Sequence, residues 1–257
     1  MATIAALLET PGALTALRRT LPRSSAALAS CRTAGALGRL LETRLVDAVI
    51  LSPRRAGIPA IARLLTLFPR LPRVLLAPFR PDDGELLMAC QRGGVAAVAV
   101  EGVDDAMLGD LVLRVSLSAA RRRALAEAPR VLRLSEQLQQ KAWNYLLDRV
   151  GEPVRTSAMA LRFRVSREHL SRQFGAGGAP NLKRVIDLTR VVSAAQLLGN
   201  PGYSVETVAH VLGFASSSHL SETARRVAGV SARQLPELGP RGVLGAFVRG
   251  KTRSRLV

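Results

Sequence analysis

The first half of the chain alternates short apolar runs with stretches of helical spacing, and this alternation constrains the fold more than any other feature. The apolar runs typical of strands are residues 3–9, 25–31, 46–52, 73–77 and 95–100. Continuous apolar strands separated by helices are typical of a parallel sheet that is buried on both faces. The pattern therefore predicts a doubly wound α/β domain over residues 1–127, with residues 104–127 as one long helical stretch at its end.

Beyond residue 131 the alternation stops, and only helical patterns remain. The expected helices are residues 134–150, 157–163, 166–174, 181–198, 204–214, 216–229 and 231–235. We therefore predict a seven-helix bundle over residues 131–238, so that the fold class of the chain is α/β plus all-α. Residues 239–257 are rich in Gly and Arg and are expected to form a flexible basic tail.

The chain is strongly basic, with a formal net charge of +18, and the excess lies mainly in its second half. Residues 129–257 carry 20 basic and 8 acidic side chains, whereas residues 1–128 carry 17 and 11. The preference for Arg, 34 against 3 Lys, is one that coding-sequence composition alone could produce. Because the excess is concentrated in the helical half, it favours a polyanionic partner such as nucleic acid.

Cysteine spacing and hydropathy argue against several other classes of protein. Cys31 and Cys90 are far apart and give neither a disulfide framework nor the spacing of a zinc site. No run of about 18 apolar residues is present to span a membrane. The N-terminus lacks the basic start of a secretory signal and carries Glu9 early. We expect a cytoplasmic protein with no cofactor and no metal site.

The tripeptide His-Leu-Ser occurs twice, at residues 169–171 and again at residues 219–221. Each copy follows a short helical stretch that carries a small residue, Ala160 in the first copy and Ala209 in the second. A small residue lets two helices cross closely, so each copy is predicted to be a helix-turn-helix. We call its second helix the reading helix. The helix at 181–198 would hold the two copies at a fixed distance, and their reading helices could then enter successive major grooves about 34 Å apart.

Three stretches carry a resemblance to a known family: "VSREHLSRQF" at 165–174, "RVVSAAQLL" at 190–198 and "SVETVAHVLGFASSSHLSETARRVAGVSARQL" at 204–235. On these stretches, residues 134–237 resemble the DNA-binding domain of the AraC/XylS family of bacterial transcription regulators. The resemblance implies a double helix-turn-helix that binds duplex DNA. This sequence has Arg164 where the family usually has Gly, His169 and His219 where it has aromatic residues, Glu222 and Ala224 where it has Arg and Phe, and Ala232 where it has Pro.

The polar positions of the two reading helices are the candidate DNA contacts. They are Arg167, Glu168, Ser171 and Arg172 in the first copy, and Ser217, Ser218, Ser221, Glu222 and Arg225 in the second. Arg can bridge guanine O6 and N7, Glu can accept from cytosine N4, and Ser can serve either base. The alternative for each is a solvated helix face or a contact with phosphate alone. His169 and His219 have no third ligand at metal spacing, so packing or phosphate contact is the interpretation that we favour.

The first half resembles a response-regulator receiver domain in its layout. The stretches that carry the resemblance are "VDAVILSP" at 46–53 and "LPRVLLAPFRPDDGELLMACQRGGVAAVAVEG" at 71–102. Ser52 stands where that family has its phosphoacceptor Asp, Ala77 where it has Ser or Thr, and Glu101 where it has Lys. The acidic pair after the first strand is reduced to Glu9-Thr10. We therefore predict a receiver-like domain without phosphorylation residues, with a general flavodoxin-like domain as the alternative.

The first hypothesis for function is a sequence-specific, DNA-binding transcriptional regulator that is not an enzyme. Its partners would be double-stranded DNA, RNA polymerase and a second copy of the chain bound through the N-terminal domain. An alternative is a protein-interaction regulator with weakened DNA reading, suggested by Glu222 and Ala224. A DNA-targeted enzyme is a further alternative, but the sequence contains no P-loop, no GxGxxG and no Ser-His-Asp elbow.

Overall fold

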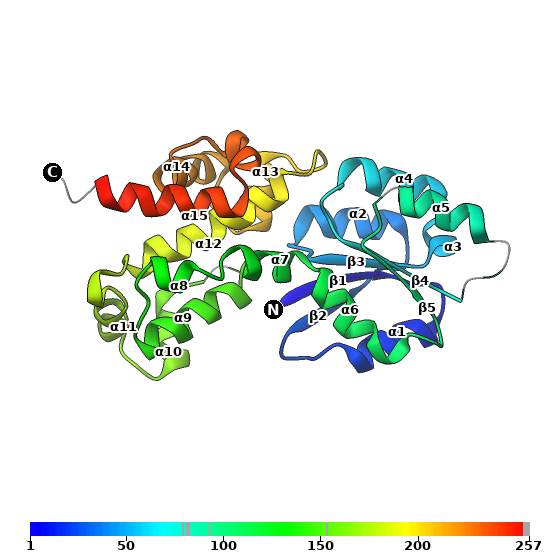
Figure 1. The fold of residues 1–257 in the computed structure, drawn as a ribbon, viewed down its shortest axis with the longest axis horizontal. Helices are drawn as coiled ribbons and strands as arrows, with labels where there is room; N and C mark the ends of the chain where they lie inside the picture. The colour runs from blue at the N-terminus through cyan, green and yellow to red at the C-terminus, as the bar shows by residue number, and fades with distance from the viewer. Residues whose placement is uncertain (79, 81–82, 93, 153, 254–257) are drawn as a thin grey trace. The chain divides into compact units, whose positions relative to one another are not determined.

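The structure is a computed structural model of the whole chain, and it describes all residues except 79, 81–82, 93, 153 and 254–257 (Figure 1). The chain divides into two compact units. The sheet unit comprises residues 1–120 and Asn200–Tyr203, and the helical unit comprises residues 121–199 and 204–257. Each unit has its own hydrophobic core and is described by itself.

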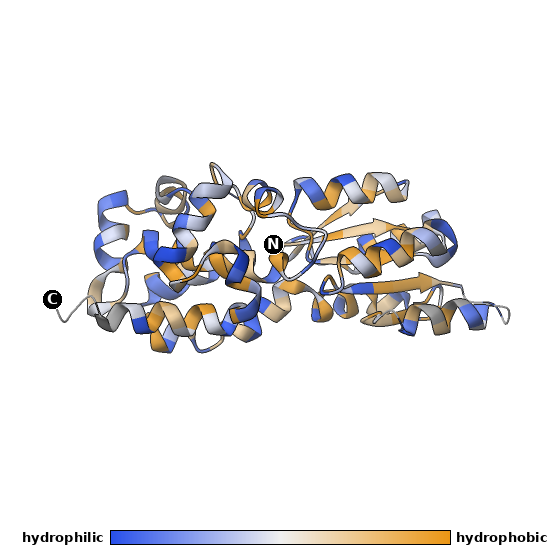
Figure 2. Ribbon diagram, turned by 90° about the horizontal axis from the view of Figure 1, so that it is seen from above, coloured by the Kyte–Doolittle hydropathy of each residue, from blue (hydrophilic) through white to orange (hydrophobic). Residues whose placement is uncertain are grey.

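The sheet unit is built on five parallel strands in the order β2-β1-β3-β4-β5. The strands are β1 (Ala2–Leu7), β2 (Ala26–Ser30), β3 (Ala48–Leu51), β4 (Arg73–Ala77) and β5 (Ala97–Val100). All five predicted strands are confirmed to within two residues at each end. This strand order is that of flavodoxin-like doubly wound sheets, and Figure 2 shows how hydrophobic its strands are. The predicted fold class is therefore confirmed.

Helices cover both faces of this sheet (Figure 1). They are α1 (Pro11–Thr20), α2 (Ala34–Thr43), α3 (Pro53–Ala56), α4 (Ile58–Leu67), α5 (Gly84–Arg92) and α6 (Leu108–Val115), with the short 3-10 helix η2 (Asp105–Met107) before α6. Alternate strand residues such as Ile4, Ile50 and Leu76 pack with Leu17 of α1 and Val112 of α6 in one buried cluster. Strand residues of the other parity are buried as well, which explains why the strands are apolar throughout.

Residues 104–127 do not form the single long helix that the sequence predicted. The helix breaks at Ser116, whose backbone is extended (φ −60°, ψ 155°). The Ser116 hydroxyl donates to the carbonyl of Leu113 at 2.7 Å and accepts from the amide of Ala119 at 3.2 Å. These bonds end α6 and begin a new helix, α7 (Leu117–Ala124). A serine that competes for backbone hydrogen bonds in this way favours caps over helix interiors.

The segment Asn200–Tyr203 belongs to the sheet unit although it follows α12 in the chain. The Asn200 side chain accepts a hydrogen bond from the amide of Arg70 at 2.7 Å, and the amide of Gly202 donates to the carbonyl of Leu67 at 2.7 Å. The buried ring of Tyr203 meets Phe68 edge to face at 5.0 Å. Burial, and then the negative charge of Asp47, raise the pKa of Tyr203 above its usual value.

The helical unit contains both predicted copies and the long helix between them. Its main helices are α8 (Ala128–Val131), α9 (Gln137–Asp148), α10 (Thr156–Phe163), α11 (Arg167–Phe174), α12 (Leu182–Leu198), α13 (Val205–Val211), α14 (Ser217–Ala228) and α15 (Leu235–Arg253). Short 3-10 helices lie at η3 (Ala176–Gly178) and η4 (Ala232–Gln234). The predicted closing helix at 231–235 is thus a 3-10 turn that leads into α15. No helix within the described residues has the length and apolar composition needed to cross a membrane.

The expectation of a flexible tail from residue 239 was wrong, because α15 continues to Arg253. Val243, Leu244 and Phe247 are buried, and α15 packs against α12 and α14. The guanidinium of Arg184 lies 5.0 Å from the centre of the Phe247 ring. These apolar residues share one helix face, a signal that the Gly and Arg content of the segment obscured. Gly239, at φ 60°, absorbs a kink at the start of the helix.

The contact between α1 and α6 gives a test of the sheet unit. A Cβ on Gly109 of α6 would lie 2.2 Å from the carbonyl oxygen of Thr20, which is backbone and cannot rotate away. We expect Gly109→Ala to lower the free energy of unfolding by about 1–3 kcal/mol, measured by urea denaturation.

Gly38 in α2 supplies the matched control, because a Cβ there would meet nothing within 4 Å. Gly38→Ala should raise the free energy of unfolding by about 0.5–1 kcal/mol, since alanine is the better helix former. If Gly109→Ala raised stability as Gly38→Ala is expected to do, the close approach of α1 and α6 would be contradicted.

Candidate nucleic-acid interface

The two copies are helix-turn-helix units with the same hydrogen bonds in the turn. In the first copy, α10 and α11, the amide of Val165 donates to the carbonyl of Ala160 at 3.0 Å. In the second copy, α13 and α14, the amide of Phe214 donates to the carbonyl of Ala209 at 2.8 Å. Both alanines are buried where the paired helices cross. The repeated tripeptide therefore marks one structural unit that is used twice.

Each turn needs a residue in the left-handed region immediately before this hydrogen bond. Gly213 takes that conformation in the second copy, at φ 67°. In the first copy the position is Arg164, at φ 56° and ψ 42°. This is why glycine is favoured there and why arginine carries strain.

Serine caps fix the start of both reading helices. Ser166 accepts from the amide of His169 at 3.0 Å, and Ser216 accepts from the amide of His219 at 3.1 Å. The second turn contains one more residue than the first, Ala215, between the buried aromatic residue and the cap. Both reading helices therefore begin with the same cap hydrogen bond despite the difference in turn length.

The long helix α12 is attached to the second copy by two cationic side chains. Arg226 of α14 donates to the buried carboxylate of Asp187 at 2.9 Å and to Thr223 at 3.3 Å. Arg190 of α12 donates to the carbonyl of Leu212 at 3.1 Å. Its guanidinium also lies 3.7 Å from the centre of the Phe214 ring. Burial lowers the pKa of Arg190 from its ordinary value, and the charge of Asp187 acts in the opposite direction.

The four candidate residues of the first reading helix, Arg167, Glu168, Ser171 and Arg172, are all exposed, while the opposite face of α11 is buried through Leu170 and Phe174. Arg167 and Glu168 approach each other at 3.5 Å, a weak contact between two exposed side chains. No described residue holds Ser171 or Arg172 through its side chain. The amphipathic character expected of a reading helix is therefore present in α11.

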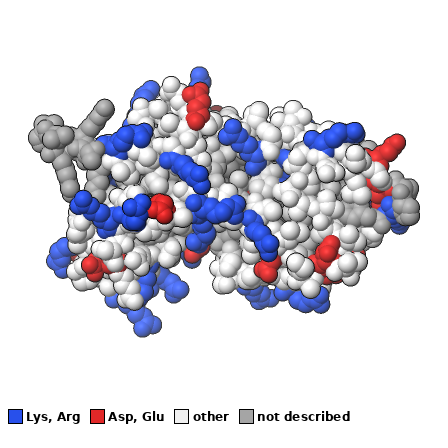
Figure 3. Space-filling view, in the orientation of Figure 1, with Lys and Arg blue, Asp and Glu red and all other residues white. Residues whose placement is uncertain are grey.

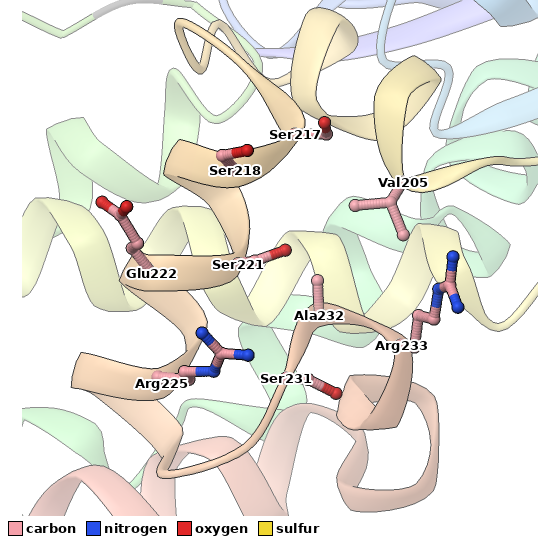
Figure 4. A pocket seen from close by; sticks show the side chains of 9 residues that line it. All are labelled: Val205, Ser217, Ser218, Ser221, Glu222, Arg225, Ser231, Ala232 and Arg233. Atoms are coloured by element: carbon pink, nitrogen blue, oxygen red, sulfur yellow. The ribbon is translucent and has the colours of Figure 1, made fainter.

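The five candidate residues of the second reading helix line one concavity of about 660 Å³ (Figure 4). They are Ser217, Ser218, Ser221, Glu222 and Arg225, and the wall is completed by Val205, Ser231, Ala232 and Arg233. In Figure 4 the guanidinium of Arg225 lies on the side of Ser231, whereas the carboxylate of Glu222 points away from Ser231. The sequence prediction missed Arg233, because it lies in η4 and not on a reading helix.

A second concavity, of about 630 Å³, is lined by residues of both copies, and we call it the inter-copy cleft. Its lining is Val154, Arg155, Thr156, Ser157, Arg167, Ser171, Lys183, Ile186, Asp187, Arg190, His219 and Arg226. Its cations come from α10, α11, α12 and α14, so no local sequence motif could have predicted that they gather. Figure 3 shows that basic side chains are spread over the helical unit with few acidic ones between them.

One of the two reading-helix histidines packs against an aromatic ring. His219 meets the Phe214 ring edge to face at 5.5 Å, and His169 is half-buried at the start of α11. Within the described residues, no three His, Cys, Asp or Glu side chains are grouped as metal ligands. Arg121 of α7 is buried and donates to Gln196 at 2.9 Å, so its guanidinium is not exposed to a partner.

The carboxyl edge of the sheet brings together the residues that stand at receiver-like positions. The Ser52 hydroxyl donates to the carbonyl of Leu76 at 2.8 Å and accepts from the amide of Glu9 at 3.2 Å. The Thr10 hydroxyl donates to the carboxylate of Glu101, and the same Thr10 oxygen caps α1. The hydroxyls of Ser52 and Thr10 thus have partners within the fold, whereas the second carboxylate oxygen of Glu101 is buried and has none among the described residues.

The two turns give a paired test of backbone strain. We expect Arg164→Gly to raise the free energy of unfolding by about 0.5–1 kcal/mol, because glycine removes the cost of the left-handed conformation. Gly213→Ala should lower it by about 1 kcal/mol for the converse reason. Urea denaturation of the full chain measures both. A loss of stability in Arg164→Gly would show that the arginine side chain, and not its backbone, dominates at this turn.

Comparison with known proteins agrees with this geometry. A protein-family model described as a helix-turn-helix domain matches residues 159–237. No curated protein matches the chain. Among solved structures, full-length FixJ from B. japonicum has a TM-score of 0.37 and 12% identity, covering 88% of this chain and 96% of that one. A TM-score of this size does not establish a common fold, so the fold of the sheet unit is assigned from its strand order. The matched family and the repeated turns together show that residues 159–237 form an AraC-type helix-turn-helix domain.

Proposed function

We propose that this protein is a sequence-specific transcriptional regulator that places α11 and α14 in successive major grooves of duplex DNA. One observation carries the proposal: each copy presents a capped helix with a buried apolar face and an exposed polar face. The second copy packs against α12, and the first packs against α9, which itself contacts α12. A recognition helix docks in this way because its polar side chains reach base edges in the major groove.

The side chains on the two exposed faces differ, which favours different base preferences for the two copies. The first offers Arg167 and Arg172 with Glu168, and the second offers three serines with Arg225. Arginine discriminates guanine through two hydrogen bonds, whereas serine hydroxyls donate or accept and discriminate less. The first copy is therefore proposed to contribute more of the specificity, and the second to contribute through Arg225.

The alternative is a regulator that acts mainly through proteins and reads DNA weakly in its second copy. Glu222 supports it, since an exposed carboxylate on a reading helix repels phosphate. Against it stand Arg225 and Arg233 on the same concavity, and the excess of 20 basic over 8 acidic side chains in residues 129–257. We therefore favour DNA reading by both copies.

The sheet unit is proposed to supply input or dimerisation and not phosphoryl chemistry. At the carboxyl edge of the sheet, Ser52 and the Thr10–Glu101 pair are hydrogen-bonded within the fold, and Ala77 has no functional group. Aspartyl phosphorylation needs a carboxylate nucleophile and acids that hold a metal ion. A second copy of the chain and RNA polymerase remain the protein partners that we propose.

Selection of bound fragments from genomic DNA, followed by footprinting with the full chain, tests the proposed function. We expect two protected patches one helical turn apart on one face of the duplex, because both reading helices belong to one compact unit. A single patch would support the alternative in which the second copy is idle. No protected site at low salt would refute DNA reading altogether.

Single substitutions on the selected duplex test the individual contacts. Arg172→Ala and Arg225→Ala should each weaken binding to the selected site by about 1–3 kcal/mol and relax base preference at one position, measured by fluorescence anisotropy. Arg23→Ala is the matched control, because Arg23 is an exposed arginine of the sheet unit. Equal losses on selected and random duplexes would instead assign these arginines to phosphate.

A further inference from the structure

The inter-copy cleft is positively charged, and only one of its cations, Arg167, is a candidate base contact. Among the described residues it is lined by five cations and one acid, and its walls come from both copies. Only Arg167 and Ser171 of the first reading helix take part in it, and His219 and Arg226 are its contribution from α14. The candidate base contacts of α14 line the other concavity. The cleft is therefore separate from the candidate base contacts of α14, although it shares Arg167 and Ser171 with those of α11.

Two of the five cations have structural roles within the fold. Arg226 is paired with Asp187, which neutralises the only acid in the lining. Arg190 is held by the carbonyl of Leu212 and by the face of Phe214. These contacts fix the shape of the cleft wall and leave its net charge positive. Arg167 has only the 3.5 Å approach of Glu168.

The other two cations, Arg155 and Lys183, are exposed and have no ion pair or side-chain hydrogen bond within the described residues. Arg155 is the N-cap residue of α10, where it makes no side-chain cap, and Lys183 lies in the first turn of α12. The hydroxyls of Thr156 and Ser157 line the same cleft. Free cations beside hydroxyl donors are the groups that proteins commonly use to hold phosphate oxygens.

We propose that the inter-copy cleft binds the sugar–phosphate backbone of the DNA segment that runs between the two major grooves, with Arg155 and Lys183 as its free phosphate ligands. This inference rests on the proposed function and adds to it a contact that carries no base information. The cations of the cleft come from both copies and are spread along it. The DNA backbone carries a phosphate at every nucleotide and can therefore contact several of these cations at once, which one isolated anion cannot do. The contact fixes the register of both reading helices on one duplex.

Salt dependence gives the first test. The full-length double variant Arg155→Ala/Lys183→Ala should bind selected and random duplexes more weakly by the same factor. Its slope of log affinity against log salt should be shallower by about 2, so that between 50 and 200 mM salt its affinity falls about tenfold less than that of the original protein. Lys141→Ala, which removes an exposed lysine of α9 outside the cleft, should leave the slope unchanged. An unchanged slope in the double variant would overturn the proposal.

Neutral methylphosphonates, placed one at a time along the footprinted duplex, give the second test. We expect a short run of positions between the two protected patches to weaken binding of the original protein and not of the double variant. If both proteins lose affinity equally there, or if only phosphates inside the patches matter, the cleft does not hold the backbone. Thermal midpoints of the variants, expected to be unchanged because both side chains are exposed, verify folding.

A small phosphorylated ligand is the competing occupant, and ATP serves as its probe. If micromolar ATP raised the thermal midpoint of the original protein and not that of the double variant, the cleft would be a nucleotide site and the backbone proposal would be overturned. If neither the original protein nor any variant gave a footprint, the proposed function would be refuted. If the original protein gave a normal footprint and the double variant kept its salt slope, only this inference would be refuted.

Discussion

The burial of α12 is the constraint on which the helical unit depends. Its residues from Val191 to Leu197 are buried without interruption, so other elements pack around its C-terminal half on all sides. A helix that is buried around its circumference cannot rotate or slide without breaking close packing. Since α13 and α14 both pack against α12, the second reading helix is held to it by packing.

Polar contacts also fix how the second copy is attached to α12. The Asp187–Arg226 pair joins α12 to α14, with the carboxylate buried and the guanidinium half-exposed. Removing Arg226 would leave the buried carboxylate of Asp187 unpaired, which costs more than the pair itself contributes. Arg190 serves the same attachment through a carbonyl and an aromatic face. Arg226 and Arg190 thus hold the second copy, whereas Arg155 and Lys183 of the inter-copy cleft have no ion pair or side-chain hydrogen bond within the described residues.

The sheet unit shows how a fold persists when the groups at its functional edge change. Its strand order and its alternation of helices need only buried apolar strands and right-handed crossovers. The carboxyl edge is where such sheets commonly place their chemistry. Here the Ser52 hydroxyl donates to a backbone carbonyl and the Thr10 hydroxyl donates to Glu101, so these groups at the edge are hydrogen-bonded within the fold. Fold and chemistry are therefore separable in this unit, as they are in other widely used folds.

The sequence by itself determined the strands, the two helix-turn-helix copies and the exposure of all nine candidate contacts except the half-buried Ser217 and Ser221. These depend on local hydrophobic spacing and on caps such as Ser166 and Ser216, whose signals lie within one turn of chain. Tertiary structure alone decided the placement of Asn200–Tyr203 in the sheet unit. The helix α15 and the break at Ser116 have local signals, an apolar helix face and a serine cap, that the sequence prediction did not use. Tertiary structure also decided the inter-copy cleft, because Arg155, Lys183 and Arg226 are separated by tens of residues and only packing brings their charges to one surface.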